Sequence, residues 1–312
     1  VNQIDPFEQP GSTLARDYFL DSVYSYFDFD PTKLPTTAGS CTTVPLKVIQ
    51  EQNLISDIKY YTKILGNNER IDELGIDNLK LIQNKKYFCF GTDSVLLANF
   101  VRSNSSNSTI IDFCSGSGII SIIVSKKKKC GKILAVELQK EMFDLLQRNI
   151  EYNNLQEKII PFLSDIKNYE KIRKEILNIS KNGTVDIIIC NPPYKTVGTG
   201  IANEEDVKYI ARHEITCTLE DVFICASNLL NTKGRLYLVH KPERLVDLIE
   251  IARRYRLEAK RIKFVQPNIN SKPSIVLLEY VKDGKNEVII EKPLIEYDKN
   301  GNYTKDFIEI YN

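Results

Sequence analysis

Several common signatures are missing from this sequence. Its seven cysteines are odd in number, and no two of them stand at a C-x-x-C spacing. Neither a structural zinc site nor a disulfide framework is therefore expected, and this cysteine usage favours a reducing cytoplasm. We predict no metal site. The formal net charge is only +1 at pH 7, so the whole-chain balance does not indicate a nucleic-acid partner.

Long apolar runs are missing as well. The longest ones, such as Ile119–Val124, are far too short to span a bilayer, and no secretory leader is recognisable. We expect no association with a membrane. The sequence also has no G-x-G-x-x-G and no G-K-[ST] motif. Dinucleotide binding and a P-loop are therefore disfavoured.

Two regions differ in character along the chain. Residues 1–65 contain scattered prolines and a Thr/Ser-rich stretch at Thr36–Thr43, and they show no pattern that predicts chemistry. We interpret them as an N-terminal extension of unknown role. Residues 66–312 are interpreted as one folded domain, in which apolar strands alternate with amphipathic helices.

The alternation predicts an α/β fold with a doubly wound, mostly parallel, seven-stranded sheet. Continuous Ile/Val runs indicate strands that are covered on both faces, and only a Pro-containing loop separates the last two, which predicts an antiparallel pair at one edge. The predicted strands are Thr109–Cys114, Lys132–Leu138, Ile159–Leu163, Thr184–Cys190, Arg235–His240, Ala259–Val265 and Ser274–Val281. The main predicted helices are Ile119–Lys127, Lys140–Asn153, Leu219–Leu230 and Glu243–Tyr255.

A glycine-containing turn, Asp112–Gly118, follows the first of these strands. Gly116 and Gly118 allow a tight turn and a close approach of the backbone to a ligand. Ligands of open α/β sheets bind outside the carboxyl ends of the strands. An acidic residue at the strand end, Asp112, suits an amino or ammonium group better than a pyrophosphate, which it would repel.

Two more acidic residues stand at the ends of the next strands: Glu137 ends the second strand, and Asp165 follows the third. A carboxylate at Glu137 can accept the hydroxyls of a ribose, and Asp165 can accept from an adenine amino group. Three strand-end acids in this order fit an adenosine-type ligand with an amino-acid tail, which is S-adenosylmethionine (SAM). Each feature also has a plainer explanation, a structural turn or a helix cap. The predicted cofactor residues of this region are Asp112, Cys114, Ser115, Gly116, Gly118, Glu137, Leu138, Asp165 and Ile166, together with Asn191.

The tetrapeptide Asn191-Pro192-Pro193-Tyr194 follows the strand Thr184–Cys190 and is the predicted catalytic segment. Two prolines fix the backbone and remove two N–H donors, which leaves acceptors, the Asn191 side-chain oxygen and the Pro192 carbonyl. Two acceptors that hold the N–H bonds of an amine on a flat π-system would direct its lone pair at the SAM methyl group. Tyr194 offers a face on which the base can stack, and a paired base would have to be flipped out. The alternative is a Pro-rich turn that only ends a strand.

The order Asp112, Glu137, Asp165 and Asn191–Tyr194 resembles the class I, Rossmann-like amino methyltransferases. Three further stretches narrow the resemblance to the bacterial tRNA(Val) adenine-37 N6-methyltransferases: Phe90–Leu97 (FGTDSVLL), Ala211–Glu214 (ARHE) and Val239–Leu245 (VHKPERL). The similarity covers roughly residues 69–311. It implies a SAM-dependent enzyme acting on an anticodon-loop adenine of tRNA, and it implies that Gly91, Thr92 and Asp93 line the cofactor pocket. For Asp93, a helix cap is an equal alternative.

Basic residues recur between Lys233 and Lys263, where acidic ones are sparser. A locally basic face fits contact with phosphates, although a solvated charged surface has the same composition. The RNA-binding candidates are Lys195, Arg212, His213, Lys241, Arg244 and Arg261. The expected partner is tRNA, and the chain is expected to act as a monomer. Two other functions stay open: a protein glutamine N5-methyltransferase acting on release factors, because the same tetrapeptide can hold a side-chain amide, and a non-catalytic RNA-binding protein with a SAM fold.

Overall fold

The structure, a computed structural model, describes residues 65–66, 68–87, 89–194 and 217–311. The chain divides into two compact units, one of residues 1–71 and 82–89 and the other of residues 72–81 and 90–312. The predicted extension, residues 1–65, lies outside the described residues except for residue 65. Strands β1 (Glu69–Glu73) and β2 (Lys80–Asn84) form a two-stranded sheet of their own.

The main sheet has nine strands and is predominantly parallel. Its spatial order is β5-β4-β3-β6-β7-β9-β8-β10, and β11 also pairs with β8. The strands are β3 (Ile110–Phe113), β4 (Ile133–Glu137), β5 (Ile159–Leu163), β6 (Val185–Cys190), β7 (Leu230–His240), β8 (Leu257–Gln266), β9 (Ile275–Lys282), β10 (Ile289–Ile290) and β11 (Leu294–Ile295). The predicted α/β class with a doubly wound, mostly parallel sheet is confirmed.

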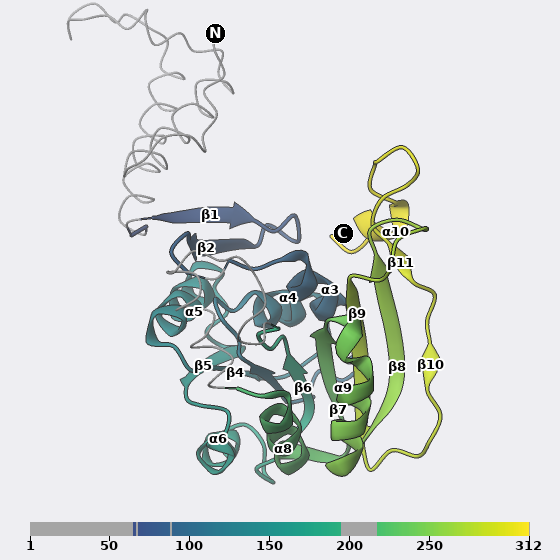
Figure 1. Ribbon diagram of the computed structural model, residues 1–312. Coiled ribbons are helices and arrows are strands. Elements are labelled where there is room, and N and C mark those ends of the chain that lie inside the picture. The colour runs from purple at the N-terminus through teal and green to yellow at the C-terminus, as the bar shows by residue number, and fades with distance from the viewer. Residues whose placement is uncertain (1–64, 67, 88, 195–216, 312) are drawn as a thin grey trace, which may run out of the picture. The chain divides into compact units, whose positions relative to one another are not determined.

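The antiparallel part of the sheet differs in one respect from the prediction. Strand β9 runs antiparallel to both β7 and β8 and lies between them. The short strands β10 and β11 then pair with β8 in parallel, so β8 is not the last strand (Figure 1). Two-residue strands of this kind are too short to leave a periodic signal in a sequence.

Helices cover both faces of the sheet. The α-helices of the large unit are α3 (Thr92–Phe100), α4 (Ile119–Lys127), α5 (Lys140–Tyr152), α6 (Tyr169–Ile176), α8 (Leu219–Leu229), α9 (Leu245–Arg254) and the short α10 (Lys305–Ile308). Alternate residues of each strand enter different cores: Ile110 and Ile133 pack with α3, α4 and α5, while Ile111 and Leu134 pack with α6, α8 and α9. This is the arrangement that continuous apolar strands predict.

Local sequence explains several element boundaries. Helix α8 begins at a capping box, in which the Thr218 hydroxyl accepts from the backbone N–H of Asp221 while the Asp221 carboxylate accepts from that of Thr218. The predicted helix Glu243–Tyr255 instead consists of a 3-10 turn at Pro242–Arg244 followed by α9. None of the described helices is long and apolar enough to cross a membrane.

Candidate active site

The carboxyl ends of the parallel strands bring the predicted site residues to one edge of the sheet. Asp112 in β3 stands beside Ala135 in β4, and Phe113 stands beside Cys190 at the end of β6. The loops that follow β3, β4 and β6 therefore start at the same level of the sheet. This edge is where open α/β sheets bind their ligands.

Asp112 is fully buried at this edge. Its Oδ2 accepts hydrogen bonds from the Ser121 backbone N–H at 3.1 Å and from the Ser121 hydroxyl at 2.7 Å, whereas its Oδ1 has no partner among the described residues. Burial raises the pKa of the Asp112 carboxyl to about 7, the Glu137 charge adds to the rise, and the two bonds from Ser121 oppose it. The unpaired Oδ1 suits a cationic or hydrogen-bonding group of a ligand.

Glu137, at the end of β4, holds the glycine turn in place. Its Oε2 accepts from the Gly116 backbone N–H at 2.8 Å, and its Oε1 accepts from the Gln139 backbone N–H at 2.8 Å. A carboxylate oxygen has room for a second hydrogen bond, so the predicted contact with ribose hydroxyls is compatible with these bonds. Leu138, which follows, is 41% exposed and offers an apolar surface beside it.

The glycine turn adopts a backbone that few side chains tolerate. Gly118 has φ 90°, and a Cβ at this position would lie 2.5 Å from the Leu146 Cδ1 atom. Gly116 has φ 56°, and its Cβ would meet only the flexible end of Met142, at 3.6 Å. Gly118 is therefore required for packing on α5, whereas at Gly116 the positive φ rather than packing favours glycine.

The thiols of Cys114, Cys190 and Cys217 affect one another's pKa. The hydrogen bond with Cys190 raises the pKa of the Cys114 thiol, and so does burial. The hydrogen bond with Cys114 and burial likewise raise the pKa of Cys217. These thiols therefore stay protonated at neutral pH and pack as small hydrophobic groups.

The two predicted cofactor residues in the loop after β5, Asp165 and Ile166, make mainly local contacts. Asp165 Oδ1 accepts from the Lys167 backbone N–H at 2.9 Å, and its Oδ2 lies 3.5 Å from the Lys167 ammonium group. The Ile166 side chain is buried in the core with α6 and α8, so it is not available to a ligand. A cofactor contact at Ile166 would have to come from its backbone. The contact of Asp165 with an adenine stays a prediction.

The tetrapeptide Asn191–Tyr194 follows β6 and is tied to the first turn of α3. Asn191 Nδ2 donates to Ser94 Oγ at 2.9 Å and to Asp93 Oδ2 at 3.3 Å. The Tyr194 hydroxyl donates to Asp93 Oδ2 at 2.7 Å, and it also lies within hydrogen-bonding distance of Asn191 Oδ1. Residues almost a hundred positions apart in the sequence thus form one cluster. Pro192 is buried and Pro193 is half-buried.

Two residues that the sequence analysis did not single out as functional complete this cluster. Ser94 is 3% exposed and holds the Asn191 amide, and its only sequence signal was its place in the FGTDSVLL stretch. His240, at the end of β7, is 2% exposed and meets the Tyr194 ring edge-on at 5.1 Å. Burial lowers the pKa of His240 to about 4, Lys241 and Arg244 lower it further, and a hydrogen bond at the Lys241 backbone opposes the shift, so the imidazole is neutral at pH 7.

The three cofactor positions predicted before the first strand, Gly91, Thr92 and Asp93, differ in their relation to this cluster. Asp93 contacts the tetrapeptide directly, and it does not cap α3, whose N-cap is Gly91. Gly91 has an extended backbone, and a Cβ there would lie 2.9 Å from the Asp93 carboxylate, so the glycine allows the carboxylate to approach. Thr92 is exposed at the helix start.

The structure corrects one of the RNA-binding candidates. Arg261 is 5% exposed, and its guanidinium group is paired with Glu279 at 2.7 Å and with Glu291 at 3.0 Å. It also donates to the Phe100 carbonyl oxygen and lies 3.6 Å from the centre of the Phe100 ring. A guanidinium with these partners stabilises the core and cannot reach a phosphate, so the assignment of Arg261 to RNA was wrong.

The other described candidates are accessible. Lys241 is exposed, and its ammonium group lies 5.8 Å from the centre of the Tyr194 ring. Arg244 is paired with Asp247 at 2.7 Å on the surface. The remaining candidates, Lys195, Arg212 and His213, lie outside the described residues.

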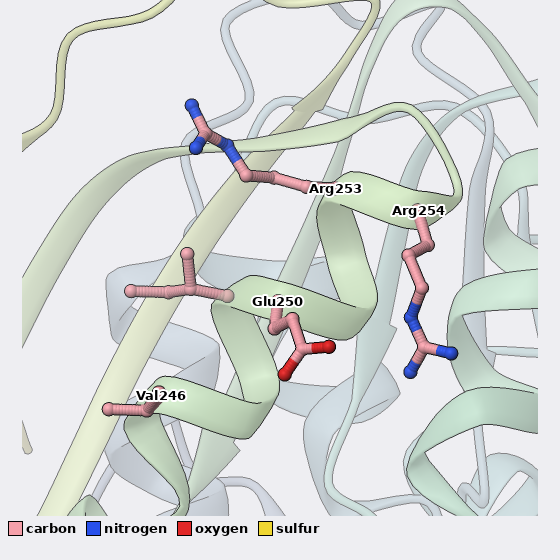
Figure 2. Close-up of a pocket in the computed structure, with 5 residues that line it drawn as sticks. Val246, Glu250, Arg253 and Arg254 are labelled. Carbon is pink, nitrogen blue, oxygen red and sulfur yellow. The ribbon is translucent and has the colours of Figure 1, made fainter.

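The other arginines of the expected basic face also have acidic partners. The pairs are Arg235–Glu279, Arg253–Glu258, Arg254–Glu220 and Arg256–Asp283. Figure 2 shows Arg253 and Arg254 leaving α9 in different directions beside a surface hollow that Val246 and Glu250 also line. None of the predicted site residues lines this hollow. The alternative of a solvated, paired charged surface therefore accounts for much of this region.

Comparisons with known proteins agree with the geometry of this edge. A family model described as the TRM5/TYW2 methyltransferase domain matches residues 85–196. A tRNA1(Val) (adenine(37)-N6)-methyltransferase of Porphyromonas gingivalis is 26% identical over 61% of this chain and 73% of its own length. A protein of the same name from Flavobacterium psychrophilum is 23% identical over 73% of this chain and 92% of its own length. The resemblance found in the sequence is confirmed.

A solved structure supports the fold independently. It is a predicted O-methyltransferase of Agrobacterium tumefaciens, with a TM-score of 0.55, 19% sequence identity, and coverage of 70% of this chain and 95% of that one. At this identity the likeness concerns the fold alone. It supports the α/β fold with a mostly parallel sheet.

The residues present fit the cofactor that this architecture implies. Two buried polar atoms beside the glycine turn have no protein partner, Asp112 Oδ1 and Ser115 Oγ. Buried polar atoms are normally hydrogen-bonded, so these two are suited to a polar ligand. The exposed Leu138 side chain adds an apolar surface. Among the described residues, no group of three or more His, Cys, Asp or Glu side chains could hold a metal ion.

Proposed function

We propose that this protein transfers a methyl group from SAM to the exocyclic amino group of an adenine in tRNA. The observation that carries the proposal is the position of Asn191–Tyr194, which follows β6 at the edge where Asp112 and Glu137 surround the glycine turn. The relatives named tRNA1(Val) (adenine(37)-N6)-methyltransferase support adenine 37 of tRNA(Val) as the nucleotide. We further propose that the chain acts in the cytoplasm as a monomer.

The cofactor residues are proposed to contact different parts of SAM. Asp112 Oδ1 and Ser115 Oγ would pair with its polar end, Glu137 with its ribose, and Asp165 with its adenine amino group. Gly116 and Gly118 keep the loop backbone close to the ligand. SAM supplies an activated methyl group on a sulfonium centre, and the protein contributes position and electrostatics.

The acceptor amine is a weak nucleophile, because its lone pair is delocalised into the purine ring. Asn191 Oδ1 and the Pro192 carbonyl would accept its two N–H bonds and so favour a pyramidal nitrogen. The Tyr194 ring would support the base by stacking. No general base is required, since the amine can lose its proton to water after the transfer.

The alternatives receive less support. A glutamine side chain could also be held by Asn191 and Pro192, but the relatives reported above are named for tRNA. A non-catalytic RNA-binding protein would not need the Asn191 side-chain oxygen as a hydrogen-bond acceptor. The relatives therefore favour the tRNA enzyme over both alternatives.

Transfer of labelled methyl groups tests the proposal. Wild-type protein should label tRNA from cells that lack this gene, and nucleoside mass mapping should place N6-methyladenosine at one anticodon-loop position. Asn191→Ala should lower the rate at least about a hundredfold, because it removes an acceptor used in the transition state, and its effect on the rate should be far larger than its effect on SAM affinity.

Asn228→Ala is the matched control. The Asn228 amide donates to the Ile224 carbonyl at 2.9 Å within α8 and touches no site residue, so this variant should keep the wild-type rate. Labelling of a release factor without labelling of tRNA would contradict the proposal. An Asn191→Ala variant as fast as wild type would contradict the mechanism.

A further inference from the structure

The first turn of α3 holds the acceptor side chains of the proposed site. Asp93 and Ser94 contact Asn191 and Tyr194 across the sheet edge, at 2.7 Å for Tyr194 Oη to Asp93 Oδ2 and 2.9 Å for Asn191 Nδ2 to Ser94 Oγ. Asp93 is itself fixed, because its Oδ1 accepts from the Ser94 backbone N–H at 2.8 Å. Both residues thus act on the tetrapeptide.

The hydrogen bond with Ser94 fixes the orientation of the Asn191 side-chain amide. A carboxamide has a donor end and an acceptor end, and a rotation of its plane exchanges them. Ser94 Oγ and Asp93 Oδ2 both accept from Nδ2, so α3 binds the donor end of the amide, and the acceptor end, Oδ1, lies next to the Tyr194 hydroxyl. Ser94 is 3% exposed, and a buried hydrogen bond of this kind competes little with water.

The Asp93 carboxylate determines which acceptor receives the hydrogen bond of the Tyr194 hydroxyl. The phenol has one proton and two neighbouring acceptors, Asp93 Oδ2 and Asn191 Oδ1. Hydrogen bonds to a carboxylate are the stronger ones, so the proton lies toward Asp93. Burial and the Asp93 charge raise the pKa of Tyr194 well above its usual value, so the phenol keeps this proton at neutral pH.

Which of these two acceptors the Tyr194 hydroxyl uses affects how well Asn191 can hold the methyl-acceptor amine. Without the Asp93 carboxylate, the Tyr194 hydroxyl would donate to Asn191 Oδ1 and occupy one of the two lone pairs of that oxygen, so the substrate N–H would meet a more crowded and weaker acceptor. With Asp93 in place, Asn191 Oδ1 keeps its accepting capacity. We infer that Asp93 and Ser94 are positioning residues that keep Asn191 Oδ1 free to accept from the methyl-acceptor amine, rather than parts of the cofactor wall. This inference rests on the proposed function.

Steady-state kinetics of tRNA methylation and calorimetry of SAM binding test it with four variants. Asp93→Ala should lower kcat about a hundredfold and change the SAM dissociation constant less than about threefold, because a blocked acceptor affects the transition state. Asp93→Asn retains a weaker acceptor, so its loss should be intermediate. It also covers the case in which the alanine variant fails to fold. Ser94→Ala should lower kcat about tenfold by releasing the amide.

The decisive variant is the double substitution Asp93→Ala with Tyr194→Phe. It removes the hydroxyl that blocks Asn191 while keeping the ring, so its kcat should exceed that of Asp93→Ala about tenfold, a coupling that independent losses would not produce. The matched control is Glu220→Gln, which removes the carboxylate partner of another tyrosine, Tyr255, at 2.7 Å outside the site. It should leave kcat unchanged.

Two results would overturn the inference alone: an Asp93→Ala variant that keeps kcat but loses SAM affinity tenfold or more, or a double variant no faster than Asp93→Ala. A wild-type protein that binds SAM and methylates no tRNA would instead overturn the proposed function, and the inference with it. The two failures are therefore distinguishable by the wild-type measurement.

Discussion

The Asp112 carboxyl group is fully buried, and its two oxygens have different surroundings. Oδ2 accepts two bonds from Ser121, and Oδ1 has none. Burial, with a smaller contribution from Glu137, raises the pKa of this carboxyl to about 7 against the lowering effect of Ser121. A cationic amine placed at Oδ1 would favour the ionised form and so lower this pKa.

A proton should therefore leave the protein when SAM binds below about pH 7. Calorimetry at about pH 6 in buffers of different ionisation enthalpy should show release of up to one proton. SAM affinity should rise with pH, by at most about tenfold per unit, and level off above the free-state pKa. Asp112→Asn should abolish the proton release. Buffer-independent enthalpies for the wild type would contradict this role of Asp112.

Single residues also show where sequence reasoning reaches its limit. Asp112, Glu137 and Asn191 could be predicted to converge because each follows or ends an apolar strand, and parallel strands end at one edge. Arg261 could not be recognised as buried, because its partners are Glu279, Glu291 and the distant Phe100 carbonyl. The sequence does not show which acidic residues will surround a given basic residue in the fold.

Among the strands and helices, those that are defined mainly by burial were predicted well from the apolar runs of the sequence. Strand β5 has the predicted bounds, and α4 begins and ends as expected. The exposed strand β10 was not predicted, because its pairing with β8 depends on the path of the chain rather than on its own residues. The link from α3 to Asn191 was missed for the same reason.

The turn into α4 offers a test at this level. Gly118→Ala should lower the free energy of unfolding by about 2–4 kcal/mol, because a left-handed backbone disfavours a side chain and the new Cβ would overlap Leu146. Chemical unfolding followed by circular dichroism measures this change. SAM affinity should fall as well.

Gly301→Ala separates the two causes. Gly301 has φ 82°, close to that of Gly118, but a Cβ there would meet nothing within 4 Å. Its cost should be only the backbone contribution of about 1–2 kcal/mol. Equal losses in the two variants would show that packing against Leu146 contributes nothing.

On the scale of the whole molecule, charge is nearly balanced, and the arginines of the expected basic face are paired with acidic residues. The net charge is +1, and Arg235, Arg253, Arg254 and Arg256 all lie against carboxylates. A phosphate would have to displace an acidic partner from each of these arginines. Lys241 differs, because it is exposed beside Tyr194 and no ion pair is recorded for it among the described residues. Binding of tRNA should therefore depend on a few cations near the site rather than on the broad basic surface.

The salt dependence of tRNA binding tests this distribution. Each phosphate contact contributes about 0.7–0.9 to the slope of log affinity against log salt. Lys241→Gln should reduce the slope by about one such contact and weaken binding, whereas Arg253→Gln, which removes a cation already paired with Glu258 at 3.0 Å, should leave both unchanged. Fluorescence anisotropy with labelled tRNA over a salt series measures both quantities. If Arg253→Gln lowers the slope as much as Lys241→Gln does, the surface ion pairs open on binding and the broad basic face takes part in RNA recognition.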